Sequence, residues 1–278
     1  MQPIVHPQQL LSVVSDDSIL IDASNHVNAR GNYQKQHLKG ALFVDTNTQL
    51  ATIHHNVAIG GRHPLPSLKQ FTTTVSQLGI TKESHVIIYD DKHGANAAAR
   101  FWWMLKAIGH KKVQVLNGGF QAALRSGFPT DDKVVTPRQV ASYTVTNWQL
   151  PLATIQEVEV LATANNSMII DVREAKRYQG ITEPIDAVAG HIPGAINLPY
   201  TTNLDDEEHF LPAHILKIHF NSILKNIPSS NVVIHCGSGV TACHTLLAMS
   251  YAGLQLPKLY VGSWSEWSRS ENPIITKK

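Results

Sequence analysis

Short hydrophobic runs alternate with longer stretches of helical periodicity along the whole chain. Four of these runs are SILID at residues 18–22, VIIYD at 86–90, SMIID at 167–171 and VVIHC at 232–236. Apolar, β-branched runs of this length are typical of buried parallel strands, and the stretches that separate them predict crossover helices. The pattern therefore predicts an α/β protein in which mainly parallel sheets are flanked by helices.

The hydrophobic pattern of the first half is repeated in the second half. Four short segments recur in the same order, about 145 to 155 residues later. The pairs are SILIDA at 18–23 with SMIIDV at 167–172, HLKGAL at 37–42 with HIPGAI at 191–196, VIIYD at 86–90 with VVIHC at 232–236, and GGF at 118–120 with GSW at 262–264. Such repetition indicates two copies of one domain.

Glycine and proline are frequent between residues 126 and 151, which indicates a connection between the two copies. We expect a first domain at residues 1–127, a linker at 128–150 and a second domain at 151–278. Thr154 and Glu157 have the spacing of a capping box, so the first helix of the second domain is predicted to begin there.

The composition is that of an ordinary globular protein, with 43% hydrophobic and 16% charged residues among 278. The net charge of +2, without a concentrated basic patch, gives no indication of a nucleic-acid partner. The N-terminus lacks a signal pattern, and no apolar stretch approaches the roughly 18 residues of a membrane span, so we expect a cytoplasmic protein with no membrane partner. Two cysteines provide no disulfide framework, and their spacing does not suit a zinc site.

Cys236 directly follows the predicted strand at 232–235 and begins a glycine-containing loop. Gly237 and Gly239 allow backbone N–H groups to converge on one point, and a helix is predicted from about Thr241. Together the N–H groups and the helix N-terminus create a positive potential that stabilises a thiolate. Ligands of open α/β sheets bind at this end of the strands, so we interpret Cys236 as a nucleophile rather than as a buried packing residue.

The other cysteine and the matching residue of the first copy do not share these features. Cys243 falls inside the predicted helix without a glycine loop of its own, so we predict that it fills the core. Asp90 occupies in the first copy the place that Cys236 occupies in the second. Because a carboxylate cannot act as a thiol nucleophile, any thiol chemistry is predicted in the second domain alone.

The loop CGSGVT at 236–241 resembles the active-site loop of the rhodanese and mercaptopyruvate sulfurtransferase family. GHIPGA at 190–195 resembles the family's mid-domain motif, and GSWSEW at 262–267 resembles its C-terminal motif. GRHPLP at 61–66 and ARFWWM at 99–104 resemble first-domain segments of two-domain bacterial members. The resemblance covers nearly the whole chain and implies two tandem rhodanese-like domains, of which the first is catalytically silent.

The resemblance implies a sulfurtransferase that works by double displacement. The Cys236 thiolate takes sulfur from a small anionic donor, 3-mercaptopyruvate or thiosulfate, and a thiol or cyanide then removes it from the Cys236 persulfide. The backbone N–H groups of the loop would hold the persulfide; the loop comprises Gly237, Ser238, Gly239, Val240 and Thr241. No metal or organic cofactor is implied.

Three further residues are candidates for binding the donor. Arg177 matches the family's substrate-anion arginine, and a guanidinium suits bidentate binding of an oxyanion. We expect Arg177 to be partly solvated and to contribute little to stability. Ser238 is predicted to hydrogen-bond the donor, and His63 matches a histidine that some mercaptopyruvate enzymes place near the loop serine. His235 precedes the nucleophile and is predicted to point to the opposite face, outside the site.

The charge of the loop bears on which donor is used. Residues 237–241 are uncharged, which resembles the mercaptopyruvate type and favours a monoanionic carboxylate over dianionic thiosulfate. Two departures weigh against this preference. Asp186 lies near the position of a second family arginine, and Asn47 replaces the acidic partner of the histidine at 63. Both donors therefore stay open.

Other classes of protein fit the motifs less well. A cysteine phosphatase needs an arginine six residues after the cysteine, where this chain has Ala242. A serine hydrolase is excluded because the glycines around Ser238 do not have the Gly-x-Ser-x-Gly spacing. A non-catalytic sulfur-relay or persulfide-binding module, which hands sulfur to a protein partner, would need the same Cys236 and is the alternative to an enzyme.

Overall fold

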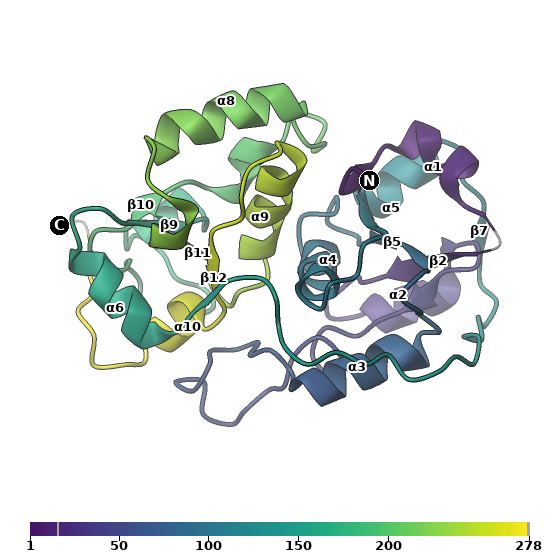
Figure 1. The fold of residues 1–278 in the computed structure, drawn as a ribbon, viewed down its shortest axis with the longest axis horizontal. Helices are drawn as coiled ribbons and strands as arrows, with labels where there is room; N and C mark the ends of the chain where they lie inside the picture. The colour runs from purple at the N-terminus through teal and green to yellow at the C-terminus, as the bar shows by residue number, and fades with distance from the viewer. Residues whose placement is uncertain (16, 277–278) are drawn as a thin grey trace. The chain divides into compact units, whose positions relative to one another are not determined.

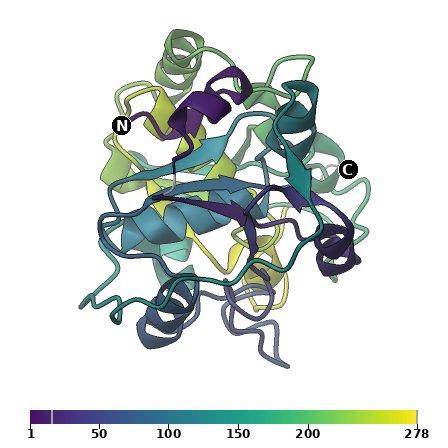
Figure 2. The same cartoon turned by 90° about the vertical axis from the view of Figure 1, so that its right-hand side faces the viewer.

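The computed structural model describes residues 1–15 and 17–276, which divide into two compact units (Figures 1 and 2). The first unit comprises Met1–Thr52, Pro66–Gln149 and Asp206–Phe210, and the second comprises Ile53–Leu65, Leu150–Asp205 and Leu211–Lys278. No helix within the described ranges is both long enough and apolar enough to cross a membrane.

Two short segments belong to the other unit than the one expected from their position in the sequence. Residues 53–65 of the first half belong to the second unit, and residues 206–210 of the second half belong to the first unit. Residues 128–149, which the sequence marks as a linker, pack with the first unit. The exchange matters because residues 53–65 include His63, one of the candidate site residues.

The first unit is built on a five-stranded parallel sheet with the strand order β1-β6-β5-β2-β4. Its strands are β1 (Ile4–Val5), β2 (Ser18–Asp22), β4 (Leu42–Phe43), β5 (His85–Tyr89) and β6 (Val113–Leu116). Its helices are α1 (Pro7–Val13), α2 (Ala29–Lys35), α3 (Leu68–Gln77), α4 (Ala97–Ala107) and α5 (Gly119–Arg125). A separate antiparallel pair joins β3 (His37–Leu38) to β7 (Thr130–Asp131).

The second unit has a five-stranded parallel sheet with the order β10-β9-β11-β12-β8. Its strands are β8 (Leu152–Ala153), β9 (Met168–Asp171), β10 (Ile196–Asn197), β11 (Val232–His235) and β12 (Lys258–Tyr260). Its α-helices are α6 (Ile155–Thr163), α7 (Ala175–Tyr178), α8 (Ala213–Leu224), α9 (Ala242–Tyr251) and α10 (Ser263–Trp267), and its 3-10 turns are Tyr200–Asn203 and Ser229–Asn231. Figure 1 shows α6 and α10 on one side of β11 and β12, with α8 and α9 on the other.

The two sheets have the same topology, which confirms the predicted α/β fold with two copies of one parallel, helix-flanked domain. In each sheet the first strand of the copy pairs with the last, and the central strand is the one that precedes the glycine-containing loop. The central strand is β5 in the first unit and β11 in the second. Asp90 and Cys236 therefore follow equivalent strands, as the repeat predicts.

Apolar side chains from both ends of each copy close the core over the sheet. In the second unit, Val158 of α6 and Trp264 and Trp267 of α10 form one cluster with Val233 of β11. The helix α6 begins at the predicted capping box, in which Glu157 N donates to Thr154 Oγ1 (3.2 Å) and Thr154 N donates to Glu157 Oε2 (3.0 Å). Packing of α10 on the sheet brings its N-terminus to the carboxyl end of β11, where Cys236 lies.

Candidate active site

The backbone of Cys236 is held on both sides by the start of α10. Cys236 N donates a hydrogen bond to Ser263 Oγ (3.2 Å), and the Cys236 carbonyl accepts one from Trp264 N (3.0 Å). The Ser263 hydroxyl in turn donates to the Tyr260 carbonyl (2.8 Å). These bonds fix the Cα position from which the Cys236 side chain extends. Cys236 is buried, with 3% of its surface exposed, so it has little contact with bulk water.

The loop after Cys236 has the close approach that requires glycine at one position. Gly239 has φ of +71°, and a Cβ there would lie 2.5 Å from the Val261 carbonyl oxygen. Gly237 O accepts a hydrogen bond from Ser265 N (2.8 Å), which ties the loop to α10. The helix α9 begins at Ala242, one residue after the predicted start. The loop is therefore compact and anchored at both ends.

Several N–H groups of this loop have no acceptor within the described part of the chain. They belong to Gly237, Ser238, Val240 and Thr241. Buried backbone donors are normally paired, so a run of free N–H groups beside a cysteine indicates a place where an anion is bound. Cys243, by contrast, is fully buried, and its Sγ donates to the Gly239 carbonyl (3.3 Å).

The matching loop of the first unit shows what such a cradle binds. The Asp90 carboxylate is fully buried and accepts hydrogen bonds from the N–H groups of Lys92, Gly94, Asn96 and Ala98 at 2.8–3.1 Å. Burial raises the pKa of Asp90 above its ordinary value, while these four hydrogen bonds act in the opposite direction. In the first unit the Asp90 carboxylate thus occupies its own loop. The equivalent position in the second unit is that of Cys236.

His63 lies next to the loop of the second unit. Its Nδ1 is 2.8 Å from Ser238 Oγ, and Ser238 is buried. The segment that carries His63 is fixed to α10, since Gly60 N donates to Glu266 Oε1 (2.8 Å) and Arg62 N donates to Ser265 Oγ (3.0 Å). Asn47, expected from the resemblance as the counterpart of an acidic partner, lies in a turn of the first unit, where its N–H donates to Asp45 Oδ1.

Arg177 is held by two carboxylates. Its Nε and NH2 contact both oxygens of Glu183 at 2.7–3.1 Å, and its NH2 donates to Asp186 Oδ2 at 3.3 Å. Only 13% of its side chain is exposed. Arg177 is thus partly solvated, as expected, but its guanidinium also compensates two buried negative charges, which is a reason to expect an effect on stability. Burial alone would raise the pKa of Glu183, but the hydrogen bonds from Arg177 and the backbone hold it below its ordinary value.

Arg62 belongs to the same cluster and was not selected from the sequence. Its Nε donates to Asp186 Oδ1 (3.0 Å) and its NH2 to Asp186 Oδ2 (3.3 Å). Arg269 NH1 also donates to Asp186 Oδ1 (3.0 Å), so one buried carboxylate receives three arginines. The signal that could have found Arg62 is the cation in the GRHPLP segment, directly before the histidine that was chosen.

Two buried ion pairs of Arg173 extend this cluster through Glu183, which also pairs with Arg177. Arg173 pairs with Asp171 (2.6 Å) and with Glu183 (3.2 Å). His235 is fully buried, with Nε2 3.8 Å from Asp171 Oδ2 and Nδ1 3.2 Å from the Cys236 carbonyl oxygen. Burial lowers the pKa of His235 below its usual 6.5, and the nearby Asp171 carboxylate opposes this effect. His235 thus contacts the backbone of the Cys236 strand rather than its thiol.

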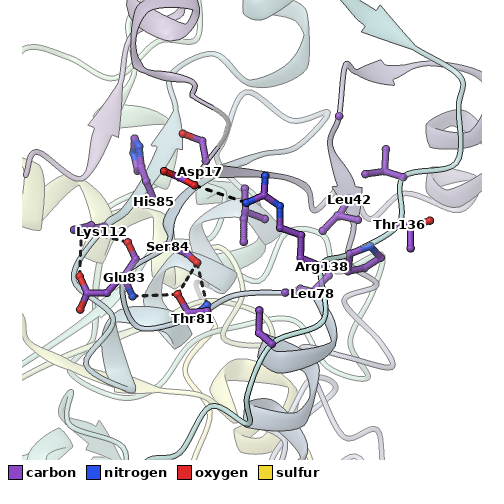
Figure 3. A pocket seen from close by; sticks show the side chains of 17 residues that line it. Asp17, Leu42, Leu78, Thr81, Glu83, Ser84, His85, Lys112, Thr136 and Arg138 are labelled. Carbon is purple, nitrogen blue, oxygen red and sulfur yellow. Dashed lines mark hydrogen bonds and ion pairs between the residues drawn. The ribbon is translucent and has the colours of Figure 1, made fainter.

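A cavity of about 660 Å³ lies elsewhere, in the first unit (Figure 3). It is located at the amino ends of β2 and β5, at the edge of the sheet opposite Asp90. Its charged side chains face one another, with Arg138 near Asp17 (3.7 Å) and Lys112 near Glu83 (3.2 Å). Both pairs are largely exposed, so water screens their charges. Within residues 1–15 and 17–276 no group of three metal-ligating side chains comes together.

Comparisons with known proteins agree with the fold. The model of the family described as "Rhodanese-like domain" matches residues 6–125 and again residues 154–270. A structure of 3-mercaptopyruvate sulfurtransferase from Leishmania major superposes with a TM-score of 0.84 at 29% identity, over 96% of this chain and 74% of that one. The chain belongs to the rhodanese-like family, with two copies of the domain.

The similarity in sequence to named enzymes indicates the activity as well as the fold. The chain is 38% identical over 249 residues to a Pseudomonas aeruginosa protein named "Probable 3-mercaptopyruvate sulfurtransferase", covering 88% of this chain and 86% of that protein. It is 34% identical over 249 residues to thiosulfate sulfurtransferase of Rattus norvegicus, covering 88% and 82%. This protein is a sulfurtransferase.

Proposed function

We propose that this chain transfers sulfur from 3-mercaptopyruvate or thiosulfate to a thiol or cyanide through a persulfide on Cys236. The observation that carries the proposal is the pairing of a buried cysteine with a loop of free N–H groups, in the unit that has arginines beside the loop. The equivalent loop of the first unit binds a carboxylate in the same place, which supports anion binding by this type of loop. The two donors are those named for the relatives.

The first half of the reaction moves sulfur from the donor to the protein. The Cys236 thiolate attacks the outer sulfur of the donor and forms a new S–S bond. The bond between that sulfur and the rest of the donor breaks, and its electron pair leaves with sulfite or with the enolate of pyruvate, which takes up a proton. The N–H groups of residues 237–241 stabilise the persulfide anion that results.

The second half of the reaction returns the cysteine to its starting state. An acceptor thiolate or cyanide attacks the outer sulfur of the persulfide, and the electron pair of the S–S bond goes back to Cys236 Sγ. In each step one bond to the transferred sulfur forms as another breaks, and the sulfur moves as a neutral atom, so the reaction needs no external oxidant or reductant.

Arg177 and Ser238 are proposed to bind the donor. The Arg177 guanidinium lies beside Gly237, within reach of an anionic group on a donor whose sulfur is at Cys236. The Ser238 hydroxyl, with His63 at 2.8 Å, donates to the oxygen that becomes negative when the enolate forms. The uncharged loop favours mercaptopyruvate, and the arginine outside the loop supplies the positive charge that its carboxylate needs.

Mass spectrometry of the intact protein after incubation with each donor tests this proposal. We expect one added sulfur atom, located on the peptide that contains Cys236 and lost again on addition of cyanide. Sulfur on Cys243, or none from either donor, would disprove the proposed site. Steady-state turnover with small donors and acceptors distinguishes the enzyme from a relay module, which would become loaded but turn over slowly.

A further inference from the structure

We propose that Arg62 is a second donor-binding residue, which forms with Arg177 a two-guanidinium site for the anionic group of the sulfur donor. The inference deepens the proposed function and rests on it. Its evidence is the environment of Gly237, the residue next to Cys236, together with the contacts that hold Arg62 in place.

Both guanidinium groups lie against Gly237. A Cβ built on Gly237 would be 2.9 Å from Arg62 NH2, 3.5 Å from Arg177 NH2 and 3.7 Å from Arg177 NH1. Gly237 does not have the positive φ that would itself demand glycine. A Cβ here would press on the tip of the Arg62 side chain and would touch Arg177 at ordinary van der Waals distance, so the two guanidinium groups line the space beside Gly237.

Each of the two arginines keeps one nitrogen available. Arg62 uses Nε and NH2 for Asp186, and Arg177 uses Nε and NH2 for Glu183 and Asp186. For the described residues, no acceptor contacts NH1 of either guanidinium. Two planar cations with free N–H₂ groups, placed next to one residue, suit the paired oxygens of a carboxylate or of the sulfonate end of thiosulfate.

The position of Arg62 is fixed by contacts with α10. Its own N–H donates to Ser265 Oγ, and Gly61, with φ of +79°, approaches so closely that a Cβ there would lie 2.3 Å from the Gly262 carbonyl oxygen. The same helix holds the backbone of Cys236. One short helix thus fixes both the nucleophile and the arginine, which gives the donor site a defined geometry.

Asp186 acts as a positioning residue for this site. Its carboxylate is fully buried and joins Arg62 Nε to Arg177 NH2 through its two oxygens. Without it, two guanidinium groups at this separation would repel each other and turn away from Gly237. Asp186 does not need to touch the donor; its role is to hold the two cations together.

Ping-pong kinetics give a direct test, because kcat/KM for the donor reports only the first half of the reaction and kcat/KM for the acceptor only the second. For Arg62→Gln we expect kcat/KM for the donor to fall about 10- to 100-fold, the effect of losing a charge-assisted hydrogen bond. The value for cyanide should change less than about twofold. Arg62→Lys should restore part of the loss, and comparing mercaptopyruvate with thiosulfate shows which anionic group is bound.

Arg269→Gln is the matched control. Arg269 binds the same Asp186 oxygen, but it is tied to the Ser265 carbonyl (2.8 Å) rather than to Gly237. We expect this variant to retain donor kcat/KM within about threefold. Equal losses for both variants, or equal falls in the donor and acceptor values, would show that Arg62 has only a structural role and would overturn the proposal.

A second variant keeps the test decisive if Arg62→Gln is poorly folded. Gly237→Ala keeps Arg62 but should displace its NH2, so we expect donor kcat/KM to fall while the value for cyanide changes less than about twofold. Equal falls in the two values would contradict the inference. A wild-type protein that gains no sulfur on Cys236 would instead refute the proposed function, so the two failures are distinguishable.

Discussion

A hydrogen bond of 2.8 Å joins Nδ1 of His63 to Oγ of Ser238, two residues that are 175 positions apart in the sequence. Both belong to the second unit, although His63 comes from the first half of the chain. The bond holds the Ser238 side chain in place in the loop that follows Cys236. An oriented hydroxyl can stabilise charge that develops in a reaction without paying to reorganise.

Replacing either partner of this hydrogen bond is expected to slow the donor step. Ser238→Ala and His63→Gln should each lower kcat/KM for mercaptopyruvate by about 1–2 kcal/mol. The double variant should lose much less than the sum, because each single variant already breaks the same bond. Steady-state kinetics of the four proteins check this, and strictly additive losses would mean that the two residues act independently.

The two cysteines are expected to differ completely. Cys236→Ser should abolish sulfur transfer, because a hydroxyl cannot form a persulfide. Cys243→Ser should keep most activity but lose about 1 kcal/mol of stability, since its Sγ packs at the start of α9. Activity assays and chemical denaturation measure the two effects, and an inactive Cys243→Ser that folds normally would contradict the assignment.

Arg177→Ala is expected to affect both binding and stability. Donor kcat/KM should fall by about 1.5–3 kcal/mol, as for loss of a hydrogen bond to a charged group. The free energy of unfolding should also fall, by about 1–3 kcal/mol, because Glu183 and Asp186 each lose a cation while buried. Arg177→Lys keeps the positive charge but cannot donate two parallel hydrogen bonds as a guanidinium does. This variant should therefore recover more stability than activity. An unchanged melting temperature would show that the ion pairs contribute little.

Asp90→Ala is expected to destabilise the first unit. Four N–H groups that now bond the Asp90 carboxylate would lose their acceptor in a buried site. The expected cost is about 2–5 kcal/mol of unfolding free energy. Below the unfolding transition, the donor and acceptor kcat/KM of the remaining folded protein should stay near wild type. A stable variant with lost activity would instead assign Asp90 a part in catalysis.

The buried His235 predicts a specific loss of stability in mild acid. Because burial lowers its folded pKa below about 6.5, the unfolded chain binds more protons at this residue as the pH falls. The free energy of unfolding should therefore decrease as the pH is lowered from about 6.5 through the folded pKa. The free energy of unfolding between pH 5 and 8 should vary less with pH for His235→Gln than for the wild type. Equal slopes for the two proteins would refute this account.

Much of the fold could be predicted because strand patterns and repeats are local signals. The runs ending at Asp22, Asp171 and Cys236 are found as parallel strands, and the capping box at Thr154 begins α6 as expected. The equivalence of Asp90 and Cys236 follows from the repeat alone. These features depend on residues near one another in sequence, where periodicity and turn chemistry carry the information.

The electrostatics of the site could not be predicted in the same way. Arg177 was identified through its resemblance to a family arginine, but its pairing with Glu183 and Asp186 depends on a loop whose path no pattern defines. Arg62 was overlooked because its partner Asp186 is 124 residues away. Gly237 has no positive φ, and the nearness of Arg62 and Arg177 to it is a long-range contact that the loop motif does not encode. Long-range contacts of charged side chains leave no periodic trace in a sequence.

Residues 53–65 pack with the second unit, and this has a consequence for folding during synthesis of the chain. During synthesis this segment leaves the ribosome long before residues 236 and 262–266 exist, so it has no surface on which to settle until the last strands and α10 have been produced. Contacts between such distant parts of a chain form late and slowly. A nascent chain with a folded first sheet therefore still lacks the contacts that hold residues 53–65, and this segment can reach its final position only after the C-terminal residues have been synthesised.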